Sequence, residues 1–344
     1  MKRRPPVMDW ATDFDHLDPE WVNDPFPIWD DLRQRCPIAH TERYDGVYLP
    51  TRYADVRAIA LDTEHFSSRK VVVHEVHAAK GSSAPPLTLD PPHHRVARSA
   101  LIAPFSPQAV AKLEPYTRTI CDELIDAFVG KSGCDAAADY ARHLPVRVIA
   151  HMLGIPAADG DRFRGWIKAI VEDGVDDGEV MQRGLDETGA YLAAHLVARR
   201  ADPKDDLISH LSRQCYPDGT PFSDDHVLGT LLLILVAGID TTWSSISASL
   251  LHLAQTPADC ARLSADPALM PQAVEEFLRV YAPVTLARQV VKEKTIGGCT
   301  FKPGEMVILS FPAANRDPEA FPDADKVIID RIAYRHAGFG LGLH

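Results

Sequence analysis

Apolar residues recur every three or four positions through the middle of the chain. Leu113, Ile120 and Leu124 form one such series, and this period places side chains on one face of an α-helix. The pattern persists from about residue 92 to residue 281, which predicts a large helical core.

The longest of these helices is predicted to run from Ser223 to about Gln255. Ser223 is a good N-cap residue, and Asp224 and Asp225 follow where acidic side chains favour the helix dipole. The middle of this helix, Leu231–Ile239, is apolar nearly all round. Such a pattern predicts a helix that is buried on every side.

Short apolar runs interrupted by Gly and Pro replace the helical pattern at about 38–50 and 284–311, which is typical of β-strands. Asp45-Gly46 predicts a two-residue type I′ hairpin turn. The segment Val71–Leu87, with its serines and prolines, predicts a long loop. The expected fold is therefore mainly α with small β-sheets (α+β), in one domain over residues 1–344.

Composition excludes several classes of function. The chain has 344 residues, 46% of them hydrophobic, and a formal net charge of −12. This surplus argues against nucleic acid or an anionic membrane surface as partner. The longest apolar run has nine residues, against the ~20 that span a bilayer. Six scattered cysteines without a CxxC spacing favour reduced thiols and a cytoplasmic location.

The first candidate for chemistry is the segment Ala237-Gly238-Ile239-Asp240-Thr241-Thr242 within the long helix. Glycine is unfavourable inside a helix, and a buried carboxyl group is costly unless it has a partner or a task. One interpretation is a helix break, with Gly238 as a C-terminal cap and Asp240 as the next N-cap. The other is an acid and alcohol pair that relays protons to a group lying against the helix.

Glu276 and Arg279 form a second candidate, because residues three apart share a helix face and can pair. Such pairs are usually solvated and contribute little to stability. Ala273 and Val280 flank Glu276 on the same face, which indicates partial burial instead.

His94 and Arg98 follow two prolines that favour a helix start, and they lie four residues apart on one face. Two cationic side chains placed in this way favour an anion opposite them, although a solvated basic face remains the alternative. His93 points about 100° away from His94, so a metal site at the two histidines is disfavoured.

The chain ends in His336-Ala337-Gly338-Phe339-Gly340-Leu341-Gly342-Leu343-His344. A Gly-x-Gly-x-Gly series suggests a phosphate loop, but that motif needs a helix after it to hold the phosphate. Nucleotide binding is therefore disfavoured.

Five motifs in a fixed order resemble the cytochrome P450 family of haem-thiolate monooxygenases, in particular its bacterial members. They are DPPHHRVARSALIAPFSP from Asp90, AGIDTT from Ala237, EEFLR from Glu275 with Arg288 in the TLARQVV that follows, NRDPEAFPDADKVIIDR from Asn315, and FGLGLH from Phe339. The resemblance runs essentially end to end, and it implies the P450 fold.

The resemblance also implies roles for individual residues. His94, Arg98, Arg288 and His344 would hold the propionates of haem b (iron protoporphyrin IX), Ala237 and Gly238 would lie against the porphyrin, and Phe339 would pack beside the haem loop. Asp240 and Thr241 would supply protons during dioxygen activation. Glu276 and Arg279 would be structural and would tie their helix to the segment near Asn315 and Arg316. Val236, Ala237, Val284, the loop Val71–Leu87 and the stretch Gly165–Arg183 would line a substrate pocket.

One departure from the family pattern concerns the axial ligand. The family's cysteine comes two residues after the position of His344, and none of the six cysteines lies in the glycine-rich segment. The thiolate favours cleavage of the O–O bond. We therefore expect this sequence to be a fragment, incomplete at its C-terminus, that binds haem poorly and is inactive as it stands.

For the full-length protein, the resemblance implies insertion of one oxygen atom from dioxygen into a small organic substrate. An apolar substrate is favoured by the mostly apolar pocket positions. Electrons would come from separate partners, a ferredoxin and its reductase, since no flavin or iron–sulfur motif is present. The alternatives are a non-catalytic haem- or ligand-binding protein on the same scaffold and an anion-binding helical protein without haem.

Overall fold

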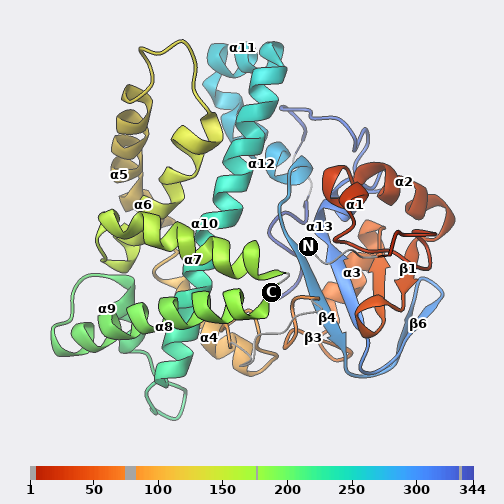
Figure 1. The fold of residues 1–344 in the computed structure, drawn as a ribbon, viewed down its shortest axis with the longest axis horizontal. Helices are drawn as coiled ribbons and strands as arrows, with labels where there is room; N and C mark the ends of the chain where they lie inside the picture. The colour runs from red at the N-terminus through yellow and green to blue at the C-terminus, as the bar shows by residue number, and fades with distance from the viewer. Residues whose placement is uncertain (1–4, 74–82, 176, 333–334) are drawn as a thin grey trace. The chain divides into compact units, whose positions relative to one another are not determined.

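The computed structural model describes residues 5–73, 83–175, 177–332 and 335–344 (Figure 1). The chain divides into two compact units, and the first consists of two separate stretches. Unit 1 comprises Met1–Glu75 and Ala248–His344, and unit 2 comprises Val76–Ser247. Helices predominate and the sheets are small, which confirms the predicted fold class. Residues 74–82 of the predicted long loop lie outside the described residues.

Unit 2 is helical. Its helices are α4 (His93–Ile102), α5 (Pro107–Asp126), α6 (His143–Leu153), α7 (Gly160–Val171), α8 (Gly178–Ala201), α9 (Leu207–Ser212) and α10 (Asp224–Gln255), of which α10 continues into unit 1 at Ala248. Leu231, Leu235 and Ile239 of α10 are fully buried in one apolar cluster with side chains from α4, α6, α7 and α8. Helix α10 therefore forms the centre of this unit's core.

Helix α10 is capped as predicted, because the Ser223 hydroxyl accepts a hydrogen bond from the His226 backbone N–H at 3.2 Å. The prediction that its middle is buried on every side is wrong. Within Leu231–Ile239, one face is buried, but Leu232, Leu233 and Val236 are only partly buried and Ala237 is exposed. By length and composition α10 could cross a membrane, the one such helix in the described ranges. Its buried leucines, however, belong to the core of unit 2.

Unit 1 is built around a five-stranded sheet in the order β1-β2-β7-β4-β3. Its strands are β1 (Ile38–Thr41), β2 (Val47–Pro50), β3 (Phe66–Ser67), β4 (Thr285–Val290) and β7 (Met306–Ser310), and β5 (Lys294–Ile296) pairs with β6 (Cys299–Phe301) in a second sheet. Strands β2 and β7 are parallel and the other neighbours antiparallel. The red and blue strands of Figure 1 thus join the two ends of the chain in one sheet.

The helices of unit 1 are α1 (Pro19–Asn23), α2 (Phe26–Arg35), α3 (Tyr53–Leu61), α11 (Pro257–Ala265), α12 (Met270–Val280) and α13 (Phe311–Asn315). Apolar side chains of α3, β4, β7 and α13 form one buried cluster, which also includes Ala337 and Leu341. The glycine-rich segment at the end of the chain is therefore packed against the same core as β4.

The prediction of a two-residue turn at Asp45-Gly46 is wrong. Strands β1 and β2 do form a hairpin, but Thr41 pairs with Val47, so five residues connect them. Tyr44, Asp45 and Gly46 all have positive φ angles. The Tyr44 hydroxyl donates a hydrogen bond to the buried Asp15 carboxylate, and this contact holds the longer turn in place.

Candidate active site

The segment Ala237–Thr242 lies within an unbroken helix, since α10 is continuous from Asp224 to Gln255. The interpretation of Gly238 and Asp240 as caps of two helices is therefore wrong. A Cβ on Gly238 would lie 2.7 Å from Cδ1 of Ile149 in α6, so a larger residue here would force the Ile149 side chain to move. The neighbouring Ala237 is exposed.

Thr241 and Asp240 present polar groups on this part of α10. The Thr241 hydroxyl donates a hydrogen bond to the Ala237 carbonyl oxygen at 2.7 Å. Within the described part of the chain, Asp240 has no hydrogen bond and no ion pair, and its burial raises the pKa of its carboxyl group above the ordinary value. Asp240 thus keeps its proton to a higher pH than an ordinary aspartate does, beside a hydroxyl group that can pass a proton on.

Helix α4 carries the predicted cationic pair. Arg98 is exposed, but only 5% of the His94 surface is accessible, so a fully solvated basic face is wrong for His94. Burial, followed by the positive charge of Arg98, lowers the pKa of His94. The imidazole is therefore held neutral near pH 7, and Arg98 supplies the positive charge of this pair. Ala100 and Leu101 of α4 are buried in the same cluster as α10.

Glu276 and Arg279 of α12 form a buried bidentate pair. The Arg279 Nε and Nη2 atoms donate to the two Glu276 carboxylate oxygens at 2.8 Å each, and the side chains are 1% and 2% exposed. A solvated surface pair is therefore wrong. Arg279 also donates to the carbonyl oxygen of Asn315 at 2.7 Å, and Asn315 Oδ1 accepts from the Ala337 backbone N–H at 2.6 Å. The pair connects α12 to α13 and to the glycine-rich segment.

The sequence did not indicate a third member of this ion network. Arg331 Nε donates to both carboxylate oxygens of Glu276, at 2.9 and 3.0 Å, and the Ile328 backbone N–H donates to Glu276 at 2.8 Å. Burial opposes ionisation of Glu276, but the hydrogen bonds from Arg279, Ile328 and Arg331 outweigh it and lower the pKa of the carboxyl group. Glu276 is therefore an ionised structural carboxylate.

The remaining predicted residues of unit 1 lie on β4 and in the glycine-rich segment. Arg288 of β4 is 2% exposed, and its Nη1 donates to the Ala287 carbonyl oxygen at 2.8 Å. Val284, just before this strand, packs partly buried against the cluster of β4 and β7. Phe339 is 76% exposed. His344 ends a segment in which Gly340 and Gly342 have positive φ angles.

The structure thus groups the predicted site residues in two sets. Unit 2 contains His94 and Arg98 on α4, together with the exposed Ala237 and the partly buried Val236, Gly238, Asp240 and Thr241 on α10. Unit 1 contains Glu276, Arg279, Val284, Arg288, Phe339 and His344.

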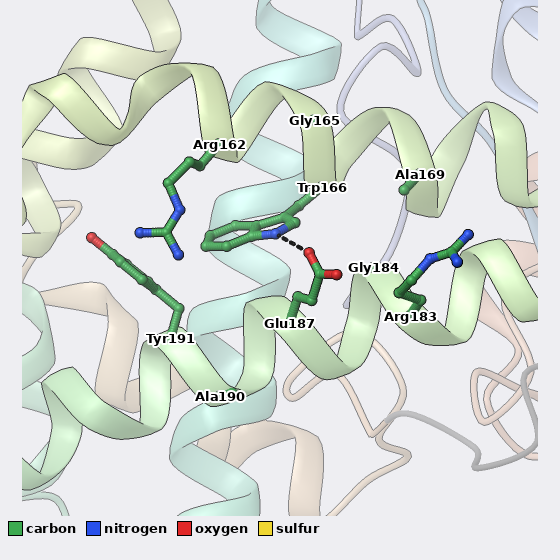
Figure 2. Close-up of a pocket in the computed structure, with 9 residues that line it drawn as sticks. All are labelled: Arg162, Gly165, Trp166, Ala169, Arg183, Gly184, Glu187, Ala190 and Tyr191. Atoms are coloured by element: carbon green, nitrogen blue, oxygen red, sulfur yellow. Dashed lines mark hydrogen bonds between the residues drawn. The ribbon is translucent and has the colours of Figure 1, made fainter.

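Unit 2 also contains a groove between α7 and α8 (Figure 2). It overlaps the stretch Gly165–Arg183 that the family resemblance assigns to a substrate pocket. Trp166 lies within that stretch, whereas the lining residues Arg162 and Tyr191 lie outside it and were not assigned to a pocket from the sequence. The available signal was the presence of glycines at positions 165 and 184 within two amphipathic helices.

Comparison with known proteins identifies the class. The model of the family described as Cytochrome P450 matches residues 186–334. The mycinamicin IV hydroxylase/epoxidase of Micromonospora griseorubida is 34% identical over 326 residues, which cover 91% of this chain and 81% of that protein. The vitamin D(3) 25-hydroxylase of Pseudonocardia autotrophica is 34% identical over 330 residues, covering 94% and 81%.

Solved structures agree with these matches. Cytochrome P450 CYP109Q5 from Chondromyces apiculatus superposes with a TM-score of 0.87 at 31% identity, covering 97% of this chain and 85% of that one. The chain belongs to the cytochrome P450 family. By family it is a monooxygenase, an oxidoreductase whose cofactor is haem b.

The chemistry of the donor groups fits the edge of a haem. Haem b carries two carboxylate side chains, and guanidinium groups such as those of Arg98 and Arg288 pair well with carboxylates. The exposed Ala237 offers a small side chain next to the Thr241 hydroxyl. The axial ligand is not among these residues, because none of the six cysteines lies between Ala337 and His344.

Proposed function

We propose that the full-length protein hydroxylates or epoxidises a small apolar organic molecule, with Asp240 and Thr241 delivering the protons. One atom of dioxygen enters the substrate and the other leaves as water, which consumes two electrons and two protons. Bound haem supplies the iron chemistry that activates dioxygen. The observation that carries the proposal is that an acid with a raised pKa precedes, on α10, a threonine whose hydroxyl group bonds to the carbonyl oxygen of the exposed Ala237.

The protein's own side chains would have three tasks in this reaction. His94, Arg98, Arg288 and His344 would bind and orient the cofactor through its carboxylates. Asp240 would hold a proton at its carboxyl group, and the Thr241 hydroxyl would pass it to the reacting oxygen. The small Ala237 would leave room for both cofactor and substrate.

The substrate and the electron donor are the finer parts of the proposal. Val236, Ala237 and Val284 are apolar and would line the substrate pocket. The relatives named for hydroxylation of vitamin D(3) and for hydroxylation or epoxidation of mycinamicin IV support a carbon-oxidising reaction. A ferredoxin and its reductase would deliver the electrons in the cytoplasm.

We further propose that residues 1–344 belong to a single P450 domain. Unit 1 is discontinuous, and unit 2 is inserted between its two halves. Strand β2 pairs with β7 between residues 259 positions apart in the sequence. Such pairing supports one domain in which neither stretch of unit 1 is complete alone.

Isotope incorporation tests the proposed reaction. Protein expressed from its complete reading frame would be supplied with haem, a ferredoxin, its reductase, NADH and ¹⁸O₂, and offered a panel of steroids and macrolides. The expected product contains one ¹⁸O atom and forms only in the presence of ferredoxin. Absence of ¹⁸O from every product would contradict the monooxygenase proposal. Activity with a flavodoxin but not with ferredoxin would contradict the proposed electron donor alone.

A further inference from the structure

Four basic side chains gather in unit 2 where α6 begins and α7 packs beside it (Figure 1). Arg142 immediately precedes α6, His143 and Arg147 belong to its first turns, and Arg164 belongs to α7. Burial, followed by the positive charges of Arg164, Arg142 and Arg147, lowers the pKa of His143. Burial and the charge of Arg142 likewise lower the pKa of Arg164. These four side chains, the α6–α7 cluster, are therefore close enough in space for their charges to oppose one another.

Close packing of α7 on α6 holds the cluster together. A Cβ on Gly160, the first residue of α7, would lie 2.8 Å from Cγ1 of Val146 in α6. The same Cβ would lie 3.9 Å from Nη1 of Arg164, so the Arg164 guanidinium lies beside this contact between the helices. All four members of the α6–α7 cluster are partly buried. Water therefore screens the repulsion between them less than it does at an open surface.

The described residues supply the α6–α7 cluster with only two carboxylate partners. Asp161 pairs with Arg164, and Glu123 pairs with Arg147 at 2.8 Å. Both carboxylates are mostly exposed. Arg142 has no ion pair in the described part of the chain, and its Nε donates to His143 Nε2 at 3.4 Å. The Arg142 guanidinium thus lies near another cation without a carboxylate of its own, which favours binding of an external anion.

The α6–α7 cluster is separate from the candidate active site. Its members lie outside the stretch Gly165–Arg183, and none of them lines the groove between α7 and α8. They also include none of the residues proposed to bind haem, to deliver protons or to line the substrate pocket. An anion bound here would therefore be a ligand other than the substrate or the cofactor.

We propose that the α6–α7 cluster binds the phosphate group of a small soluble molecule. Its guanidinium groups present more N–H donors, in planar pairs, than the two oxygens of a carboxylate accept, and a phosphate offers further oxygens. The phosphate would pair with Arg142 and offset the repulsion between Arg142 and Arg164. An anionic membrane surface is a poor source of this phosphate, because the chain itself has a net charge of −12.

Calorimetry with inorganic phosphate tests the site. The full-length protein would be titrated at constant ionic strength, with chloride replaced by phosphate. Arg142→Gln should weaken phosphate binding at least tenfold, because it removes a charged donor with planar paired N–H groups. Arg213→Gln is the matched control, since it removes an exposed arginine of unit 2 that lies outside the cluster. Equal affinity of the two variants would overturn the proposal, as would the absence of saturable binding to wild type.

Thermal unfolding separates binding from a structural role of Arg142. Phosphate should raise the unfolding midpoint of wild type, since a ligand that binds only the folded state stabilises it. Without phosphate, Arg142→Gln should unfold at the wild-type midpoint, and with phosphate it should lose most of the rise. A variant with a lowered midpoint and an undiminished rise would show that Arg142 supports the fold and does not bind the anion.

The source of the phosphate group is tested with two further probes. Glycerol 3-phosphate, a soluble phosphate ester, should compete with inorganic phosphate for the wild-type protein. Vesicles of phosphatidylcholine that contain phosphatidic acid should not sediment with the protein. Sedimentation with these vesicles, together with no binding of glycerol 3-phosphate, would overturn the assignment to a soluble ligand.

Discussion

Asp240 and Glu276 are both carboxylates on helices of the same chain, but they differ in their hydrogen-bond partners and in the direction in which their pKa is shifted. Glu276 is held by two arginines and a backbone N–H, and these contacts lower its pKa in spite of burial. Asp240 has no such partner in the described residues, and burial raises its pKa. Burial alone therefore does not distinguish a structural carboxylate from one available for proton transfer, whereas the partners do.

The residues next to the two carboxylates extend this difference. Arg279 uses its remaining donors on the carbonyl oxygens of Asn315, Ala324 and Lys326, so the ion network has no spare group for a ligand. The Thr241 hydroxyl makes one bond to its own helix, and Thr241 is only partly buried. The Glu276 network is thus suited to holding unit 1 together, and the Asp240–Thr241 pair to chemistry.

The largest effect is expected from breaking the structural network. Arg279→Ala leaves the Glu276 carboxylate buried with one of its two arginines missing, and we expect the free energy of unfolding to fall by about 3–5 kcal/mol. Urea unfolding followed by circular dichroism measures the change.

An exposed pair of the same chemistry is the control. Glu114 and Arg118 of α5 are 60% and 75% exposed and bond at 2.8 Å, and Arg118→Ala should leave the unfolding midpoint unchanged within error. A loss for Arg279→Ala as small as that for Arg118→Ala would show that the buried network does not stabilise the protein.

A smaller effect is expected at Thr241. Thr241→Ala should lower the product formed per pair of electrons about tenfold, equivalent to ~1.4 kcal/mol of barrier, while peroxide rises and electron consumption continues. The physical reason is loss of the hydroxyl group beside Asp240. Product and peroxide, measured together against NADH consumed, give the coupling directly.

Thr230→Ala separates proton delivery from helix geometry. The Thr230 hydroxyl, also on α10, donates to the carbonyl oxygen four residues back at 2.8 Å, as Thr241 does. It is 2% exposed. Thr230→Ala should leave coupling intact. If both variants release peroxide to the same extent, the role of Thr241 is to shape the helix.

The smallest effect concerns the dependence of stability on pH. Burial raises the pKa of Asp240 in the folded protein, so ionisation of this side chain lowers the stability of the fold. This loss of stability is absent below the unfolded pKa of 3.8 and appears as the pH rises through the folded value. Asp240→Asn should therefore be more stable than wild type near neutral pH, and the difference should vanish in acid.

Glu276→Gln should show the opposite sign. The pKa of Glu276 is lowered in the folded protein, so the ionised carboxylate stabilises the fold. This stabilisation is present above the unfolded pKa of 4.5 and is lost as the pH falls through the folded value. Unfolding free energies at about pH 3 and about pH 8 compare the two variants. The same sign for both variants would contradict the distinction drawn between the two carboxylates.

Local patterns predicted much of this molecule. Helical periodicity located the long helix and its Ser223 cap, and the order of the five motifs indicated the family. The spacing of Glu276 and Arg279 predicted their shared face. These features depend on residues within one or two helical turns, which is the range over which sequence spacing determines geometry.

The features that were missed depend on contacts between distant residues. Arg331 reaches Glu276 across 55 positions, and Tyr44 reaches Asp15 across 29 to hold a longer turn. The burial of His94 and the one-sided burial of α10 depend on which helices pack against them. No local pattern contains this information, because tertiary contacts decide it.

By its family, the protein is expected to be a haem-thiolate enzyme. The most direct test is the absorption spectrum of the ferrous carbon monoxide complex, recorded on protein expressed from its complete reading frame and supplied with hemin. We expect the red-shifted Soret band of thiolate ligation. An unshifted band typical of imidazole ligation, or a protein that takes up no haem, would contradict it.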